Sequence, residues 1–357
     1  MNKKKSIGIA TITSHNLGNR LQNYALQEYL VSKNYDVKTI PKNSYTVIKK
    51  ELKRLKFIIK LVLSKFIKKY KSVSWECFNG KINWENYSVK DNSEALVKKY
   101  DYFIAGSDQI WNPLFNIDRN KMFLTFARKE QKIAYAASIG ISELPKEWEE
   151  FYAKNIKEFT SISVREDDAA KIIKNLTGRS VKVLIDPTML LTKEKWEEVA
   201  KDSRININYK YVVKYFLGPR NDKYDEYIEN RAKEIGAKVL DVTEYNEENN
   251  DVIGPAEFVY LIANSNGVFT DSFHATVFSL LFEKSFIVFD RAVEKETGNM
   301  SSRLDTLLNK FNIKGQRIVD VYELDNIHPE VDYKKIGKIL QKERKIAEEY
   351  LEEALNK

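Results

Sequence analysis

Short apolar runs alternate with amphipathic helical patterns over most of the chain. The apolar run at 6–13 predicts a buried strand, and apolar residues three and four positions apart predict a helix over 21–32. We expect further strands at 36–40, 101–106, 132–137, 161–165, 181–185, 211–217, 238–242, 267–270 and 286–289. We expect further helices at 148–159, 167–175, 223–235, 255–263, 275–281, 302–312 and 333–355. Strands that alternate with helices are typical of α/β domains.

The alternation falls into two series, which indicate two domains. A chain of 357 residues is too long for one ordinary core. The pattern predicts an N-terminal Rossmann-like domain at 1–190, a C-terminal Rossmann-like domain at 191–330 and a final helix at 331–357, with the domains facing each other across a cleft. Neither G-x-G-x-x-G nor G-x-x-x-x-G-K-[ST] occurs, so the sequence supports neither a dinucleotide site nor a P-loop.

Composition limits the environment and the bound groups. Cys77 is the only cysteine, which excludes a disulfide framework and a cysteine-rich zinc site and suits a reducing compartment. The first apolar run is short and broken by Thr11 and Thr13, so it is typical of a strand and not of a signal peptide. We therefore expect a cytoplasmic protein with no resident cofactor or metal.

One basic segment accounts for the net charge of +8. Residues 41–71 contain eleven Lys or Arg and one acid, a local charge of +10, which leaves −2 for the rest. The protein is therefore not a uniformly basic nucleic-acid binder. Within this segment, residues 44–71 have the spacing of a basic amphipathic helix. It either binds an anionic membrane surface, which would make the protein peripheral on the inner face, or packs on the first domain with a solvated cationic face.

A histidine follows one of the predicted strands at the start of a helix. The stretch 269-FTDSFHATVFSLLFEKSFIVFD-290 predicts strand, turn, helix and strand, with His274 at the turn. Open α/β sheets bind ligands at the carboxyl ends of their strands, and helix N-termini favour anions. His274 thus indicates acid/base chemistry on an anionic substrate, although a lone histidine is more often structural. Asp271 is a candidate cleft-lining residue that orients His274 or the turn, or it merely caps the helix.

The loop after the first strand and the strand end at 161–165 carry further candidates. Asn16 and Gly18 lie in a predicted tight loop that either lines the cleft or forms an ordinary turn with a helix cap. Arg165 follows a buried strand, where it either holds a phosphate or carboxylate or forms a salt bridge.

The stretch 104-IAGSDQIWNP-113 resembles a sugar-binding rim, because polar residues at a strand end are followed by a tryptophan. Ser107, Asp108 and Trp111 are its candidate cleft residues. The alternative is a turn in which Asp108 caps a helix and Trp111 belongs to the core.

Taken in order, several of these motifs resemble the polysaccharide pyruvyl transferase family. They are N-x-G-x-x-L-Q-x-Y-A-L-Q from Asn16 to Gln27, AGSDQIWNP, 134-AYAASIG-140, SVRE, 185-IDPTMLL-191, TDSFH and 301-SSRLDTLL-308. The resemblance implies a fold similar to the two-domain GT-B glycosyltransferases. It also implies transfer of pyruvate from phosphoenolpyruvate to a pair of sugar hydroxyls, on a saccharide or lipid-linked saccharide, in cell-surface polysaccharide biosynthesis.

The resemblance also implies roles for individual residues. His274 would be the acid/base, Arg165 an anion clamp and Ser272 an additional donor. Well-studied members carry arginine two residues before the histidine, where this chain has Ser272. Either Arg165 compensates together with Lys284, Arg291 or Arg303, or this branch uses another donor; we expect Arg303 in the donor site.

Two other functions remain open from the sequence. One is a GT-B-type glycosyltransferase that uses a nucleotide sugar; the chain lacks an Asp-x-Asp metal motif, but such enzymes can do without it. The other is a non-catalytic saccharide-binding relative, motivated by the departure at Ser272.

Overall fold

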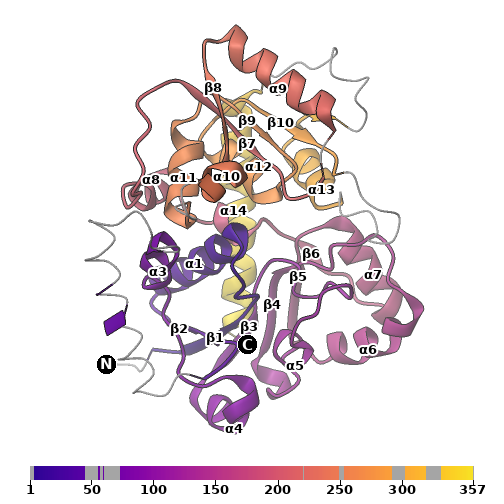
Figure 1. The fold of residues 1–357 in the computed structure, drawn as a ribbon. Coiled ribbons are helices and arrows are strands. Elements are labelled where there is room, and N and C mark those ends of the chain that lie inside the picture. Colours follow the sequence, from indigo (N-terminus) through magenta and orange to yellow (C-terminus); the bar gives the residue numbers. More distant parts are fainter. Residues whose placement is uncertain are drawn as a thin grey trace.

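The computed structural model describes residues 4–44, 55–56, 59, 73–219, 221–248, 253–291, 302–318 and 331–356. It contains two parallel sheets with helices, one in each half of the chain (Figure 1). The predicted α/β architecture with two Rossmann-like domains is confirmed. Residues 45–54, 57–58 and 60–72 lie outside the described part, so the structure gives no description of the basic amphipathic helix expected at 44–71.

The first sheet has six strands, and its order changes direction between β1 and β3. Across the sheet the strands are β2 (Asp36–Thr39), β1 (Ser6–Ala10), β3 (Tyr102–Ala105), β4 (Lys132–Ala137), β5 (Ser161–Val164) and β6 (Lys182–Val183). A ligand crevice is expected where the winding reverses, at the carboxyl ends of β1 and β3. The loops that begin at Thr11 and Gly106 leave the sheet at that point.

Helices cover both faces of this sheet. The helices of the first half are α1 (Leu17–Ser32), α3 (Val73–Asn79), α4 (Val89–Lys99), α5 (Arg119–Met122), α6 (Lys146–Lys157) and α7 (Asp167–Thr177). On β1, Ile7 and Ile9 pack with α1, whereas Ala10 belongs to the cluster that contains α6 and α7. The run at 6–10 is apolar throughout because both faces of the sheet are covered.

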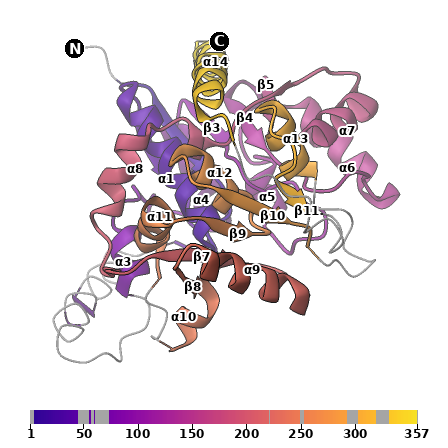
Figure 2. The ribbon, with the colours of Figure 1, turned by 90° about the horizontal axis from the view of Figure 1, so that it is seen from above.

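The second sheet has five strands and the same kind of reversal, between β7 and β9. Its order is β11 (Arg317–Ile318), β10 (Phe286–Phe289), β9 (Val268–Thr270), β7 (Tyr211–Tyr215) and β8 (Lys238–Asp241). Its helices are α8 (Lys193–Ala200), α9 (Asp222–Glu234), α10 (Val242–Glu248), α11 (Pro255–Asn264), α12 (Phe273–Leu281) and α13 (Ser302–Lys310). Seen from above, α9 and α11 lie on opposite sides of the sheet (Figure 2). The reversal places the start of α12 at a ligand crevice as well.

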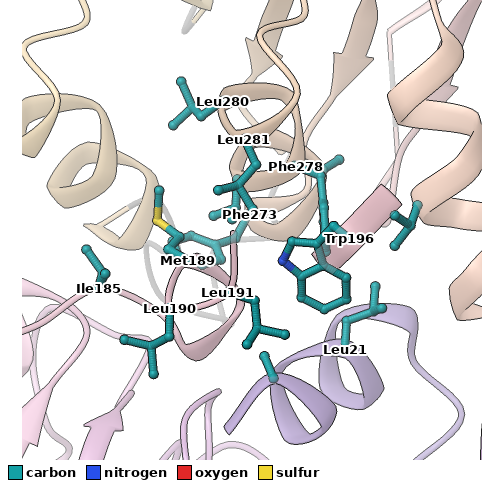
Figure 3. Close-up of a cluster of buried hydrophobic side chains, with 14 of the residues drawn as sticks. Leu21, Ile185, Met189, Leu190, Leu191, Trp196, Phe273, Phe278, Leu280 and Leu281 are labelled. Carbon is teal, nitrogen blue, oxygen red and sulfur yellow. The ribbon is translucent and has the colours of Figure 1, made fainter. Parts of the chain in front are cut away.

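An apolar cluster joins the two domains (Figure 3). Met189, Leu190 and Leu191 of the connecting segment belong to this cluster together with Leu21 of α1 and Phe278 of α12. The Trp196 ring meets that of Phe278 edge-on at 4.8 Å. The core therefore continues across the domain boundary, and this contact positions α12 against α1.

The C-terminal helix α14 (Tyr333–Leu355) passes from one domain to the other (Figure 1). Arg344 donates to the carbonyl oxygens of Met189 and Leu191 at 2.7 and 2.6 Å, and Tyr350 Oη donates to Ala134 O at 2.7 Å. The helix thus binds both the connecting segment and the first sheet.

The structure differs from the sequence prediction in two places near the start of the chain. Helix α1 begins at Leu17 and not at residue 21, because the Asn16 side chain caps it by accepting from Asn19 N at 3.1 Å. Two short helices, α3 and α4, lie before residue 100 in a stretch for which the sequence pattern predicted no element. Among the described helices, none is long and apolar enough to cross a membrane.

Candidate functional site

A cavity of about 590 Å³ lies between the carboxyl ends of the two sheets. Its walls come from the α1 N-terminus, the loop after β3, the ends of β7 and β9, and two arginines. The lining residues are Ile12, Ser14, Asn16, Gly18, Asn19, Asp108, Gln109, Leu114–Ile117, Tyr215, Leu217, Phe258, Ser272–His274, Arg291 and Arg303. Of the predicted site residues, the structure therefore brings together Asn16, Gly18, Asp108, Ser272, His274 and Arg303.

His274 lies in the first turn of α12, at the centre of this constellation. Ser272 is the N-cap, and its Oγ accepts from Ala275 N at 3.4 Å. The imidazole is 7% exposed and packs directly on Gly18 of the other domain, where an added Cβ would lie only 2.0 Å from Nδ1. Glycine is required here because the helix backbone approaches the ring so closely, and not because of its dihedral angles.

Asp186 lies behind His274 and was missed at the sequence level. Its Oδ2 is 3.6 Å from His274 Nε2, within ion-pair reach but longer than a hydrogen bond. In the described part of the chain, Nε2 is buried without a hydrogen-bond partner. The signal for Asp186 was present in the motif IDPTMLL, since the aspartate directly follows an apolar run predicted to be a strand.

The carboxylate of Asp186 is held ionised by its surroundings. Ser107 Oγ and Arg165 Nη1 each donate to Oδ2 at 2.9 Å, and Thr188 donates to Oδ1 through Oγ1 at 2.7 Å and through N at 3.0 Å. Burial would raise the pKa of Asp186, but His274, Arg165 and the Thr188 N–H together hold it well below its usual range. A fixed negative charge therefore faces the imidazole at 3.6 Å.

Arg165, predicted as an anion clamp, does not line the cavity. It is 3% exposed, and its guanidinium pairs with Asp186 at 2.9 Å and with Asp108 at 3.4 Å. It also lies over the Phe273 ring, with 4.3 Å from Cζ to the ring centre. The structure thus gives Arg165 a positioning role: it fixes Asp186 and contacts the start of α12.

Asp108 lines the cavity in a strained backbone conformation, with φ of +78°. Its carboxylate accepts from Gln109 N at 2.8 Å and from the Asn19 side-chain amide. Ser107 beside it is fully buried and bonds Asp186, so it supports the site from behind and does not line the cavity.

Two arginines supply positive charge to the cavity. Arg291 Nε lies 2.9 Å from Asp271 Oδ2. Burial, together with nearby Arg165, lowers the pKa of Arg303 to about 10, so its guanidinium remains charged at neutral pH. Within the described residues, Arg303 Nε has no hydrogen-bond partner. Lys284, the third cation considered from sequence, does not line the cavity.

Two predicted cleft residues prove to be structural. Trp111 is fully buried, stacks on Phe123 at 5.5 Å and donates from Nε1 to Met122 O at 3.1 Å, so it belongs to the core. Asp271 accepts from Leu217 N and Gly218 N at 2.7 and 2.9 Å. It therefore fixes the loop after β7, and it neither orients His274 nor lines the cavity.

His15 is not in this cavity wall. His15 lines a neighbouring cavity in the first domain, with its ring 4.9 Å from that of Trp75. His328 lies outside the described residues.

The model of the polysaccharide pyruvyl transferase family matches residues 16–292. The chain belongs to this family. The match includes Asn16, Asp108, Asp186 and His274 but ends before Arg303. No curated protein matches the sequence of this family member.

Solved structures with similar chain folds share little sequence with it. A functionally uncharacterised protein from Klebsiella pneumoniae is 13% identical, with 89% of this chain and 93% of that chain covered and a TM-score of 0.49. UDP-GlcNAc 2-epimerase from Neisseria meningitidis, bound to UDP-GlcNAc, is 11% identical, with 96% and 94% covered and a TM-score of 0.49. The E. coli ADP-heptose lipopolysaccharide heptosyltransferase II is 10% identical, with 95% and 99% covered and a TM-score of 0.39.

Proposed function

We propose that the protein transfers the pyruvyl group of phosphoenolpyruvate to two hydroxyls of a saccharide, forming a cyclic ketal and releasing phosphate. The observation that carries this proposal is the buried pair of His274 and Asp186, because His274 lines a cavity that Arg291 and Arg303 also line. An acid/base group next to two cations suits an anionic donor that must be protonated.

The reaction needs one proton delivered and two removed. Protonation of the donor methylene carbon makes C2 electrophilic, and one sugar hydroxyl attacks C2. The second hydroxyl then forms the other C–O bond as the C2–O bond to phosphate breaks. His274 delivers the proton to the methylene carbon and then takes the proton of the attacking hydroxyl, so it ends in its starting form. The proton of the second hydroxyl leaves with the phosphate. Asp186 faces the imidazole with a fixed negative charge.

In this proposal, cationic side chains of the second domain bind the charged groups of the donor. Arg303 and Arg291 take the phosphate and carboxylate groups, in place of the arginine that well-studied relatives carry at the position of Ser272. Ser272 has a different role: it caps α12, whose first turn lines the cavity.

The acceptor is a saccharide or lipid-linked saccharide, and the first domain supplies its contacts through Asn16 and Asp108. We also propose that the basic segment 44–71 holds the protein on an anionic membrane surface, close to a lipid-linked acceptor. This part rests on the sequence pattern alone.

The test is incubation with phosphoenolpyruvate and a mixed pool of saccharide acceptors. We expect phosphate release that depends on the saccharide, and no release by His274→Gln protein with an unchanged unfolding temperature. Lack of saccharide-dependent release would count against pyruvyl transfer. Glycosyl transfer from a nucleotide sugar in the same assay would replace it with the glycosyltransferase alternative.

A further inference from the structure

A second cavity of about 420 Å³ adjoins the first one on the side of the N-terminal domain. The two cavities share Ile12, Ser14, Asn116 and Ile117 in their walls, so they are neighbouring compartments. The pyruvyl transfer proposed above leaves this second compartment without a role.

Its walls have the chemistry of a saccharide site. Amide side chains come from Asn43, Asn79, Asn86 and Asn116, and Trp84 supplies an aromatic surface. Side-chain amides match vicinal sugar hydroxyls because they donate and accept side by side. The Oδ1 atom of Asn79 is buried and lacks a hydrogen-bond partner within the described residues, so the site holds an acceptor group that a ligand hydroxyl can satisfy.

The cavity also contains a buried ammonium group. Lys121 is 3% exposed, and its Nζ donates to Ile40 O at 2.6 Å. In the described part of the chain, no carboxylate lies within ion-pair distance of Lys121 Nζ, so Asp118 compensates its buried charge only from farther away. Burial, opposed by Asp118 and reinforced by Arg20, lowers the pKa of Lys121 to about 7.

Arg20 adds a second cation to the same wall. It is 4% exposed, and its guanidinium lies over the Trp84 ring at 5.0 Å. Two acids also line the cavity: Glu85 is paired with Lys99 at 2.5 Å, and Asp118 caps α5 by accepting from Lys121 N at 3.3 Å. The lining therefore contains three cationic side chains, Arg20, Lys42 and Lys121, and two acidic ones.

We propose that this compartment binds the acceptor saccharide through a negatively charged substituent, a phosphate or a carboxylate, with Lys121 and Arg20 as its cationic contacts. The inference rests on the proposed function in one respect, since the ligand is taken to be the acceptor. It adds that the acceptor is an anionic saccharide and that its charged part lies in the first domain.

Binding of three sugars to the full-length protein, without phosphoenolpyruvate, tests the inference. Galactose, galactose 1-phosphate and galacturonate differ in the charged group, and calorimetric titration at pH 6.5 compares their dissociation constants. A hydrogen-bonded charge pair makes at least one charged sugar bind about tenfold more tightly than galactose. The phosphate and carboxylate arms identify which group the site prefers, and inorganic phosphate shows whether the sugar is needed.

Lys121→Met should remove this preference, so that the charged sugars bind no more tightly than galactose. The matched control is Lys132→Met, which removes another buried lysine, on β4, that lines neither cavity. Unfolding temperatures show whether each variant is folded at the temperature of the titration. Equal affinity of the wild-type protein for charged and neutral sugars would overturn the inference whether or not Lys121→Met folds, as would inorganic phosphate binding as tightly as the charged sugars.

The pH dependence gives a second readout. The affinity for galacturonate, whose charge is constant here, should fall as the pH rises from 6 to 8, because Lys121 loses its proton. The other charged or titratable groups facing this cavity are His15, Arg20, Lys42, Glu85 and Asp118. A pH effect that survives in Lys121→Met would contradict the role of Lys121.

These results separate the inference from the proposed function. Pyruvyl transfer to a neutral saccharide, together with equal binding of the three probes, would uphold the function and overturn the inference. Selective binding of a charged sugar by a protein that releases no phosphate would uphold the inference and overturn the proposed function.

Discussion

Replacing Gly18 by alanine tests whether the position of the His274 ring governs the reaction. The new Cβ would lie 2.0 Å from Nδ1 and 2.6 Å from both Cγ and Cε1. Non-bonded heavy atoms pack at about 3.5 Å, so the ring and α1 must separate by roughly 1.5 Å. The ring is enclosed by Phe273 at 5.3 Å between centres and by the wall around Asp186, so it moves relative to its carboxylate partner.

The expected result is a large loss of rate with little loss of stability. A misplacement of about 1 Å in a catalytic group can cost about 100-fold in rate. Alanine in a helix is favoured over glycine by up to about 1 kcal/mol, which offsets part of the steric cost. Saccharide-dependent phosphate release should therefore show kcat about 100-fold lower, with a smaller change in KM for phosphoenolpyruvate.

Gly337→Ala is the matched control for this experiment. Gly337 lies in α14, and an added Cβ there would meet nothing within 4 Å. We expect the wild-type rate and a small rise in unfolding temperature. If Gly18→Ala protein also kept the wild-type rate, the close contact between Gly18 and His274 would not be what positions the imidazole, and the reasoning would be refuted.

Three further changes test other parts of the site. Asp186→Asn should lower kcat by two or more orders of magnitude. It should also lower the free energy of unfolding, measured in denaturant titrations, by about 3 kcal/mol, because Arg165 is left incompletely paired. Because the folded-state pKa of Asp186 is depressed, its contribution is present above about pH 4 and is lost as the pH falls below that value, so the variant should show less acid sensitivity there. Arg303→Met should raise KM for phosphoenolpyruvate about tenfold or more, and an unchanged KM would remove Arg303 from the donor site. Reversing the lysine charges in 44–71 should reduce sedimentation with anionic liposomes at low salt; equal pelleting would refute membrane binding by this segment.

The sequence predicts best those strands that are buried on both faces of a sheet, because burial on both faces requires a run of apolar residues. β1, β4 and β9 are entirely buried, so their sequences are apolar runs that end sharply at polar residues. Helix α3 was not predicted because it is short and its stability depends on packing against other elements. Its residues Trp75 and Phe78 lie in the same apolar cluster as residues of α11. Local spacing does not reveal such contacts.

The site was predicted in part for a similar reason. A strand end followed by a helix predicts where the sheet edge carries polar side chains, and His274, Asp108 and Asn16 do line the cavity there. It does not tell which side chains face the cavity and which support it from behind. Arg165 and Asp186 are within hydrogen-bonding distance of each other but 21 positions apart in sequence, so only the fold shows that the predicted anion clamp is neutralised by a carboxylate.

The chemistry of the donor is the central claim, and mass spectrometry of the acceptor tests it most directly. The protein is incubated with phosphoenolpyruvate and a saccharide pool that includes charged sugars. The mass of each sugar is then measured. The account predicts a new species with the mass of one pyruvyl ketal, formed in equal amount to the phosphate released and absent with His274→Gln. Release of phosphate without any ketal-bearing sugar, or ketal formed equally by His274→Gln protein, would contradict it.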